Sequence, residues 1–200
     1  MSEILFIRHA ETDMAGTFCG HSDPDLNARG WIQVGELIDR LRSENIGMVY
    51  TSDLRRAHQT ALALAKAFRV ECHARAALRE IDFGRWDGHS WKEIERQDAA
   101  YARRWVAEYP NLPAPDGESF DCFERRVLKE VKVVVGKAED TGCSIAVVTH
   151  AGVLRSVLRT LHGYSEEDIW ERTRSYCSVA RYLTPPALAK RAGLREHSFQ

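Results

Sequence analysis

The chain has little of what marks several classes of protein. Its five cysteines include no Cys-x-x-Cys pair, so neither a zinc site nor a disulfide framework is indicated, and reduced thiols in a cytoplasmic protein are expected. No apolar run is long enough to cross a membrane, and the first residues lack the pattern of a secretory signal, so no membrane partner is expected. The histidines show no metal-binding spacing, so no metal is expected.

The chain also has no excess of positive charge. It contains 28 Lys and Arg residues against 29 Asp and Glu residues, which gives a net charge of −1. A nucleic-acid-binding surface needs a broad excess of cations, so no nucleic-acid partner is expected. The 200 residues are 44% hydrophobic and contain no low-complexity run, and residues 1–200 are therefore predicted to form a single domain.

Two histidines follow apolar runs that are typical of buried strands. Residues 4–7 lead into Arg8 and His9, and residues 144–149 lead into His150. The ligand crevice of an open α/β sheet lies beyond the carboxyl ends of its strands, so these side chains are expected to meet there. An imidazole can attack a phosphoryl group, and a guanidinium can neutralise and orient that group. A hydrogen-bonded rim residue is the alternative for each histidine.

Two further segments carry charges suited to a phosphate ester. An apolar run at residues 48–50 passes through a turn into a predicted helix at residues 54–68, whose first turn contains Arg56. The N-terminus of a helix binds anions, and an arginine there strengthens the site. Glu80 lies near the start of a glycine-punctuated loop and is a candidate proton donor, with a solvated loop charge as the alternative.

These four segments, in this order and spacing, resemble the histidine phosphatase superfamily, which includes the cofactor-dependent phosphoglycerate mutases. The resemblance covers about residues 3–183. It implies that His9 is the nucleophile that becomes phosphohistidine and that Arg8, Arg56 and His150 bind the transferred phosphoryl group. It also implies that Glu80 is the general acid. The partner is then a small-molecule phosphate, and no metal or other cofactor is needed because the arginines and histidines supply the positive charge.

Other candidate site residues lie in two loops. Thr12 and Thr17, in the loop after the first histidine, and Glu118 and Ser119, in a Gly-Glu-Ser element, are candidates for a substrate loop. Ala15 departs from the family pattern, which has an asparagine three residues past the threonine. Its amide donor to the phosphate is missing, and Thr17 or a backbone N–H would have to replace it.

The alternation of strands and helices predicts an α/β fold with three layers, α/β/α, around a mostly parallel sheet. Asn27 is expected to cap a helix from residue 28 to about 43, with Ile32 on its apolar side. A long helix is expected from residue 119 to about 138, and a closing strand at residues 178–183.

The segment at about residues 85–118 is expected to form a helical insertion over the active site. Ser90 and Glu93 form a capping-box pattern at the start of a stretch that is rich in tryptophan and tyrosine. The aromatic rings either pack on the domain or cover the crevice, and the sequence favours neither interpretation. The tail at residues 187–200 is a candidate for a flexible segment.

A phosphatase is favoured over a mutase. The family's mutases carry Arg-His-Tyr-Gly after the acid, where Glu80 is followed here by Ile81, Asp82, Phe83 and Gly84. This difference removes cations and adds a carboxylate, which is expected to repel a phosphoglycerate. Only the paired Arg103 and Arg104 favour a mutase, and a solvated face of a helix is their alternative interpretation.

Among phosphatases, three segments (residues 19–22, 83–86 and 91–105) are similar to the α-ribazole-5′-phosphate phosphatases, and broad-specificity phosphatases share parts of the pattern. The sequence therefore predicts a metal-independent phosphomonoesterase that works through a phosphohistidine, with α-ribazole-5′-phosphate as the candidate substrate. A phosphoglycerate mutase and a non-catalytic module that binds phosphorylated ligands are the alternatives.

Overall fold

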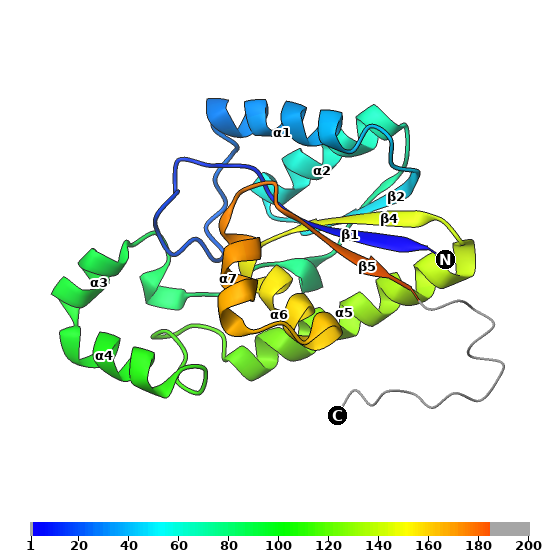
Figure 1. The fold of residues 1–200 in the computed structure, drawn as a ribbon. Helices are drawn as coiled ribbons and strands as arrows, with labels where there is room; N and C mark the ends of the chain where they lie inside the picture. The colour runs from blue at the N-terminus through cyan, green and yellow to red at the C-terminus, as the bar shows by residue number, and fades with distance from the viewer. Residues whose placement is uncertain (1, 185–200) are drawn as a thin grey trace, which may run out of the picture.

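A five-stranded sheet forms the middle layer of the protein, with strand order β3-β2-β4-β1-β5 (Figure 1). The computed structural model describes residues 2–184. The strands are β1 (Glu3–Arg8), β2 (Ile46–Thr51), β3 (Cys72–Ala74), β4 (Ser144–Thr149) and β5 (Val179–Leu183). All neighbouring strands are parallel except the β1–β5 pair. The predicted α/β fold with a mostly parallel sheet is confirmed.

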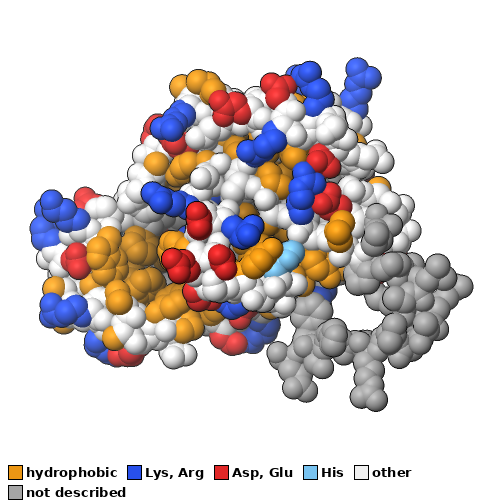
Figure 2. Space-filling view, viewed as in Figure 1, with side chains coloured by type: hydrophobic (Ala, Val, Ile, Leu, Met, Phe, Trp, Pro, Cys, Tyr) orange, Lys and Arg blue, Asp and Glu red, His pale blue; other side chains and the backbone are white. Residues whose placement is uncertain are grey.

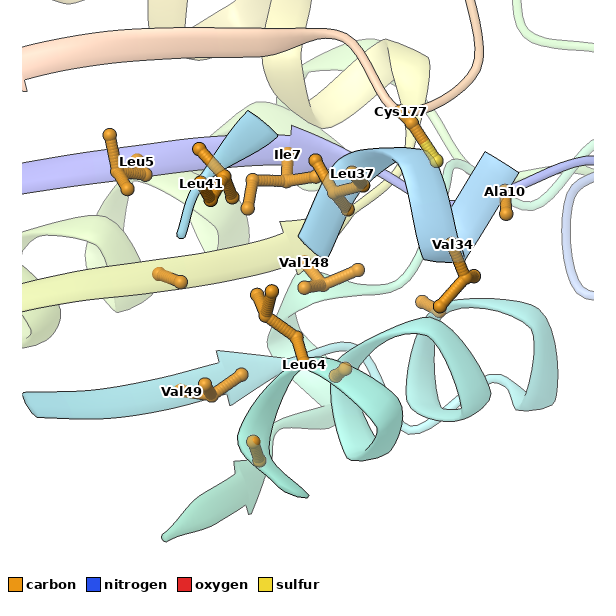
Figure 3. Close-up of a cluster of buried hydrophobic side chains, with 14 of the residues drawn as sticks. Leu5, Ile7, Ala10, Val34, Leu37, Leu41, Val49, Leu64, Val148 and Cys177 are labelled. Carbon is orange, nitrogen blue, oxygen red and sulfur yellow. The ribbon is translucent and has the colours of Figure 1, made fainter. Parts of the chain in front are cut away.

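Helices cover both faces of this sheet. The helices are α1 (Ala28–Arg40), α2 (Arg55–Phe68), α3 (Trp91–Gln97), α4 (Ala99–Glu108), α5 (Phe120–Thr141), α6 (Ala151–His162) and α7 (Glu166–Arg174), with short 3₁₀ turns at Ala76–Leu78 and Gly84–Trp86. Leu5 and Ile7 of β1 pack with α1 and α2 (Figure 3), whereas Ile4 and Phe6 pack with α5 and α6. Because successive side chains point to opposite faces, a strand covered on both sides is apolar throughout.

The ends of α1 show what local sequence determines. The Asn27 side chain accepts a hydrogen bond from the backbone N–H of Gly30 (2.8 Å), so the predicted cap is present. The helix ends at Arg40, somewhat before the predicted end. The placement of Ile32 on the apolar side was wrong, because this side chain is 64% exposed while Val34 is buried. Positions 32 and 34 are two residues apart, which corresponds to about 200° around a helix, so the two side chains cannot both face the core.

Helix α5 begins directly after Ser119, whose side chain accepts a hydrogen bond from the backbone N–H of Cys122 (3.3 Å). It continues to Thr141, slightly beyond the predicted end, and it buries Phe123, Val127, Val131, Val134 and Ala138. Helix α7 was not predicted. The predicted closing strand is β5, whereas the tail at residues 187–200 lies outside the described residues.

Helices α3 and α4 form the insertion, at the side of the molecule away from the N-terminus (Figure 1). The predicted capping box is present, because Ser90 and Glu93 exchange hydrogen bonds between their side chains and backbones. The insertion has its own buried cluster of Trp86, Ile94, Ala102 and Ala114. Hydrophobic side chains gather on the same side of the molecule in Figure 2. Within residues 2–184, no helix is both long and apolar enough to span a membrane.

Candidate active site

A cavity of about 270 Å³ lies where β1 and β4 end. It is lined by residues from the end of β1 and the loop after it, from the loop after β3, from α3 and α6, and from the segment between α7 and β5. The lining residues are Arg8, His9, Thr12, Met14, Gly16, Thr17, Phe18, Cys19, Glu80, Phe83, Trp91, Ala151, Arg155 and Tyr176. The cavity therefore lies at the carboxyl end of β1, as expected for an open α/β sheet.

His9 follows β1 directly and is 7% exposed. Its Nδ1 donates a hydrogen bond to the Ala10 carbonyl (2.7 Å), because a carbonyl oxygen can only accept. The proton is therefore on Nδ1, and Nε2 keeps a free lone pair. Burial holds the pKa of His9 well below 6.5, and the charges of Arg56 and Arg8 lower it further. The imidazole is neutral at pH 7, which is the form that attacks phosphorus.

Arg8 is the last residue of β1, and its guanidinium is held by the carboxyl end of α7. Its Nη1 donates to the carbonyls of Thr173 (3.0 Å) and Arg174 (2.6 Å), and Cζ lies 4.3 Å from the centre of the Tyr176 ring. Its buried Nε has no hydrogen-bond partner among the described residues. The cation is thus fixed beside the nucleophile with a donor to spare.

Arg56 lies in the first turn of α2 and is fully buried. Its guanidinium donates to the carbonyls of Ser22 (2.7 Å), Gly20 (2.8 Å) and Cys19 (3.1 Å). It does not line the cavity, but its charge is the second-largest cause of the lowered pKa of His9. The structure therefore places this cation behind the cavity, where it also fixes the loop at residues 19–22.

His150 is the residue before α6 and is fully buried. Its ring centre lies 5.1 Å from that of His9, and neither ring nitrogen has a hydrogen-bond partner within the described part of the chain. Burial and the nearby Arg56 hold the pKa of His150 well below 6.5. The side chain does not line the cavity, but a buried N–H without a partner is costly, and an oxyanion held against His9 could satisfy it.

Glu80 is buried and lines the cavity. One carboxyl oxygen accepts a hydrogen bond from the backbone N–H of Ile81 (3.0 Å), and the other accepts from that of Gly152 (2.9 Å) in the first turn of α6. A Cβ atom at Gly152 would collide with this carboxyl group. Only glycine at this position lets α6 approach Glu80 closely enough to orient it.

Arg126 of α5 fixes the backbone that carries Glu80, and the sequence did not identify it. Its guanidinium donates to the carbonyls of Ala77 (3.0 Å), Arg79 (2.8 Å) and Glu80 (2.8 Å). It also pairs with the Glu118 carboxylate (2.7 Å). These partners are far from Arg126 in the sequence, so no local pattern indicates the contact.

The four residues predicted for a substrate loop lie in two different places. Thr12 and Thr17 line the cavity, but Glu118 and Ser119 do not. Glu118 pairs with an arginine of α5, and Ser119 caps that helix, so the Gly-Glu-Ser element supports the fold rather than the cavity. Ala15 is exposed in a turn and does not line the cavity either.

The remaining charged residues of interest are placed away from the cavity. The carboxylate of Asp82 lies 3.5 Å from Nδ1 of His21 and is not part of this cavity lining, and the repulsion of an anionic acid by this residue stays a prediction. Arg104 pairs with Glu108 on an exposed face of α4 (2.9 Å), which is the solvated arrangement. The lining residues that the sequence did not identify as site residues are Met14, Gly16, Phe18, Cys19, Phe83, Trp91, Ala151, Arg155 and Tyr176. Among residues 2–184, no group of three or more His, Cys, Asp or Glu is arranged to hold a metal ion.

Comparisons with known proteins agree with this geometry. Residues 4–186 match the histidine phosphatase superfamily (branch 1). A metal-independent phosphoserine phosphatase of Arabidopsis thaliana is 36% identical over 163 residues, which cover 78% of this chain and 67% of that protein. The crystal structure of the α-ribazole phosphatase from Shigella flexneri is 28% identical and superposes with a TM-score of 0.74 over 84% of each chain.

A bifunctional protein of Mycobacterium tuberculosis is 34% identical over 162 residues. The matched region is 79% of this chain but only 43% of that protein, so the chain spans less than half of this relative's length. The family match, by contrast, extends over nearly the whole sequence and includes every strand-end motif. The chain therefore belongs to the histidine phosphatase superfamily, branch 1.

Proposed function

We propose that the protein is a phosphomonoesterase that transfers the phosphoryl group of a small-molecule ester to His9 and then to water, without a metal. The observation that carries the proposal is the state of His9. Its Nδ1–H is fixed by a carbonyl, and burial keeps the ring neutral, so Nε2 has its lone pair free in a cavity with cations around it. This is what a nitrogen nucleophile needs.

In the first step, Nε2 of His9 forms a bond to phosphorus as the bond from phosphorus to the ester oxygen breaks. The protonated Glu80 gives its proton to the leaving alkoxide. Arg8, Arg56 and His150 stabilise the charge on the non-bridging oxygens as it redistributes.

In the second step, the Glu80 carboxylate takes a proton from water while the oxygen of that water attacks the phosphohistidine. The nitrogen–phosphorus bond breaks, inorganic phosphate leaves, and both His9 and Glu80 return to their starting states. Every group in this cycle is held by hydrogen bonds to backbone amides or carbonyls or is fully buried. The site is thus pre-organised for transfer in both steps.

The substrate is proposed from the relatives and the cavity wall. Relatives are named as phosphoserine phosphatases and α-ribazole phosphatases. Three aromatic side chains, Phe18, Phe83 and Trp91, line the cavity and favour a planar group such as the one in α-ribazole-5′-phosphate. The exposed ion pair of Arg104 removes the one feature that favoured a mutase.

A cytoplasmic location and one catalytic domain over residues 1–200 belong to the same proposal. The scattered cysteines support a reducing compartment. A single domain should unfold in one cooperative transition, which calorimetry would detect.

The test is phosphate release in the presence of EDTA from p-nitrophenyl phosphate, O-phosphoserine, α-ribazole-5′-phosphate and 3-phosphoglycerate. Release is expected from the wild type and from His73→Ala, a matched variant at β3 outside the cavity. No release is expected from His9→Ala. Formation of 2-phosphoglycerate without release would establish a mutase, and unchanged release by His9→Ala would refute the proposal. Binding of these compounds without release would indicate a non-catalytic module.

A further inference from the structure

Arg155 of α6 is a second arginine in the cavity wall, and the proposed reaction does not use it. Its Nε donates a hydrogen bond to the Thr173 hydroxyl (3.2 Å), and its Cζ lies 3.5 Å from the centre of the Trp170 ring. These contacts with α7 restrict the side chain to one orientation. A guanidinium held in this way loses little conformational entropy when it binds a ligand.

No carboxylate among residues 2–184 forms an ion pair with Arg155, and the charge that acts on it most favourably is that of Glu80 in the same cavity. Arg159, one helical turn further along α6, pairs with Glu166 (2.7 Å). The cavity lining contains one carboxyl group, that of Glu80, and both of its oxygens already accept hydrogen bonds from backbone amides. Because Arg8 and Arg155 share the charge of this one carboxyl group, the cavity lining keeps an excess of positive charge.

The position of Arg155 along α6 places it on the Glu80 side of the cavity. It lies one helical turn after Gly152, whose backbone N–H donates to the Glu80 carboxyl. Arg8 and Arg155 both contact Thr173, one through its carbonyl and the other through its hydroxyl, so α7 holds the two guanidinium groups close to each other. In the proposed reaction Glu80 protonates the alcohol oxygen. A ligand whose phosphoryl group sits at His9 would present its alcohol part toward Arg155.

We propose that Arg155 is a specificity-determining residue that binds a carboxylate on the alcohol part of the substrate. The inference rests on the proposed function for the place of the phosphoryl group. Of the two substrates that the relatives' names suggest, it favours phosphoserine, which has a carboxylate, over α-ribazole-5′-phosphate, which has none. The carboxylate of Asp82 lies beside His21 and does not line this cavity.

The experiment uses two ligands that differ only in a carboxylate, O-phosphoserine and phosphoethanolamine. Their dissociation constants are measured by calorimetry on His9→Ala, which prevents turnover, and on that variant with Arg155→Met added. A matched protein carries Arg159→Met in place of Arg155→Met. O-phosphoserine is expected to bind about tenfold more tightly than phosphoethanolamine, because a charge-assisted hydrogen bond is among the stronger polar contacts.

Arg155→Met should bring the ratio of the two constants close to one, and Arg159→Met should leave it unchanged. If Arg155→Met lowered the affinity for both ligands by the same factor, Arg155 would bind the phosphoryl group that they share, and the proposal would be wrong. Before the substitution, equal affinity for the two ligands would also overturn the proposal, and so would the binding of neither ligand. Hydrolysis of p-nitrophenyl phosphate by the wild type is measured in parallel. Hydrolysis without a preference for O-phosphoserine would refute the role of Arg155 alone, whereas no hydrolysis would count against the proposed phosphatase activity.

Discussion

The floor of the cavity and its aromatic wall are held by different kinds of interaction. The floor is the name used here for Arg8 and His9, which line the cavity, together with Arg56 and His150, which are buried behind them, and three of these four side chains donate hydrogen bonds to backbone carbonyls. The wall consists of Phe18, Phe83 and Trp91, which pack through ring contacts such as the 4.9 Å edge-to-face pair of Phe18 and Phe83. Directional bonds fix atomic positions, whereas apolar packing tolerates changes of shape. Chemistry should therefore depend on the floor and substrate choice on the wall.

The largest loss of activity should come from a substitution in the floor. Arg56→Lys keeps the charge but cannot donate to three carbonyls at once, so the loop at residues 19–22 loses its anchor. We expect kcat/KM to fall by about a thousandfold and the free energy of unfolding by about 3 kcal/mol. Steady-state kinetics and urea unfolding would measure both. Arg55→Lys, at the exposed neighbouring position, is the control, and equal effects of the two variants would contradict the role of Arg56.

A smaller loss of activity is expected from a substitution at the contact between α6 and the general acid, Glu80. The methyl group of Gly152→Ala would displace the Glu80 carboxyl from its hydrogen bond. We expect kcat to fall about a hundredfold for alkyl phosphates and less for p-nitrophenyl phosphate, whose leaving group needs no proton. Gly136→Ala in α5, where a Cβ atom meets open space, should leave the rates unchanged. An equal loss for both kinds of ester would argue against Glu80 as the acid.

A substitution in the aromatic wall should change KM rather than kcat. Trp91→Ala removes one aromatic side chain from the cavity lining, so KM for an ester with a large planar group should rise about tenfold. The kcat for phosphoethanolamine should change less than twofold, because the floor is intact. Trp31→Ala, on the exposed face of α1, controls for the loss of a tryptophan. A collapse of kcat on every ester would show that wall and floor are not independent.

The smallest expected effect is the pH dependence of stability from the two floor histidines. The pKa of each is lowered from 6.5 in the folded protein, so below about pH 6.5 the unfolded chain binds protons that the folded protein does not. Stability should therefore fall as the pH drops below 6.5, by at most about 1.4 kcal/mol per pH unit for each histidine. Thermal unfolding at several pH values would show a shallower slope for His150→Gln. A Tm that stays constant or rises below pH 6.5 would be inconsistent with neutral buried rings.

The floor could be anticipated from the sequence because each of its parts is local. An apolar run followed by a histidine occurs at both strand ends, and the parallel topology brings Arg8, His9 and His150 to one edge of the sheet. Helix starts at Asn27 and Ser90 are equally local, since each cap needs only a residue in the following turn. The family resemblance added the expected role of each side chain.

The wall and the supporting contacts could not be anticipated in this way. Arg126 and Arg155 lie on helices whose orientation toward the cavity depends on tertiary packing. The same limit applies to Glu118, because its carboxylate is used by Arg126 only after α5 and the loop at residues 77–80 have come together. The contact of Asp82 with His21 is another tertiary contact that no local pattern indicates.

A phosphoryl group bound covalently to His9 is the central feature of the proposed reaction. Wild-type protein would be mixed with a hydrolysable ester, quenched in base during turnover, digested and examined by mass spectrometry. One added phosphoryl group, labile to acid, is expected on the peptide that contains His9, and none on the same peptide of His9→Ala. Phosphate release with no phosphorylated His9 at any time during turnover, or a phosphoryl group on a different residue, would contradict the proposed reaction.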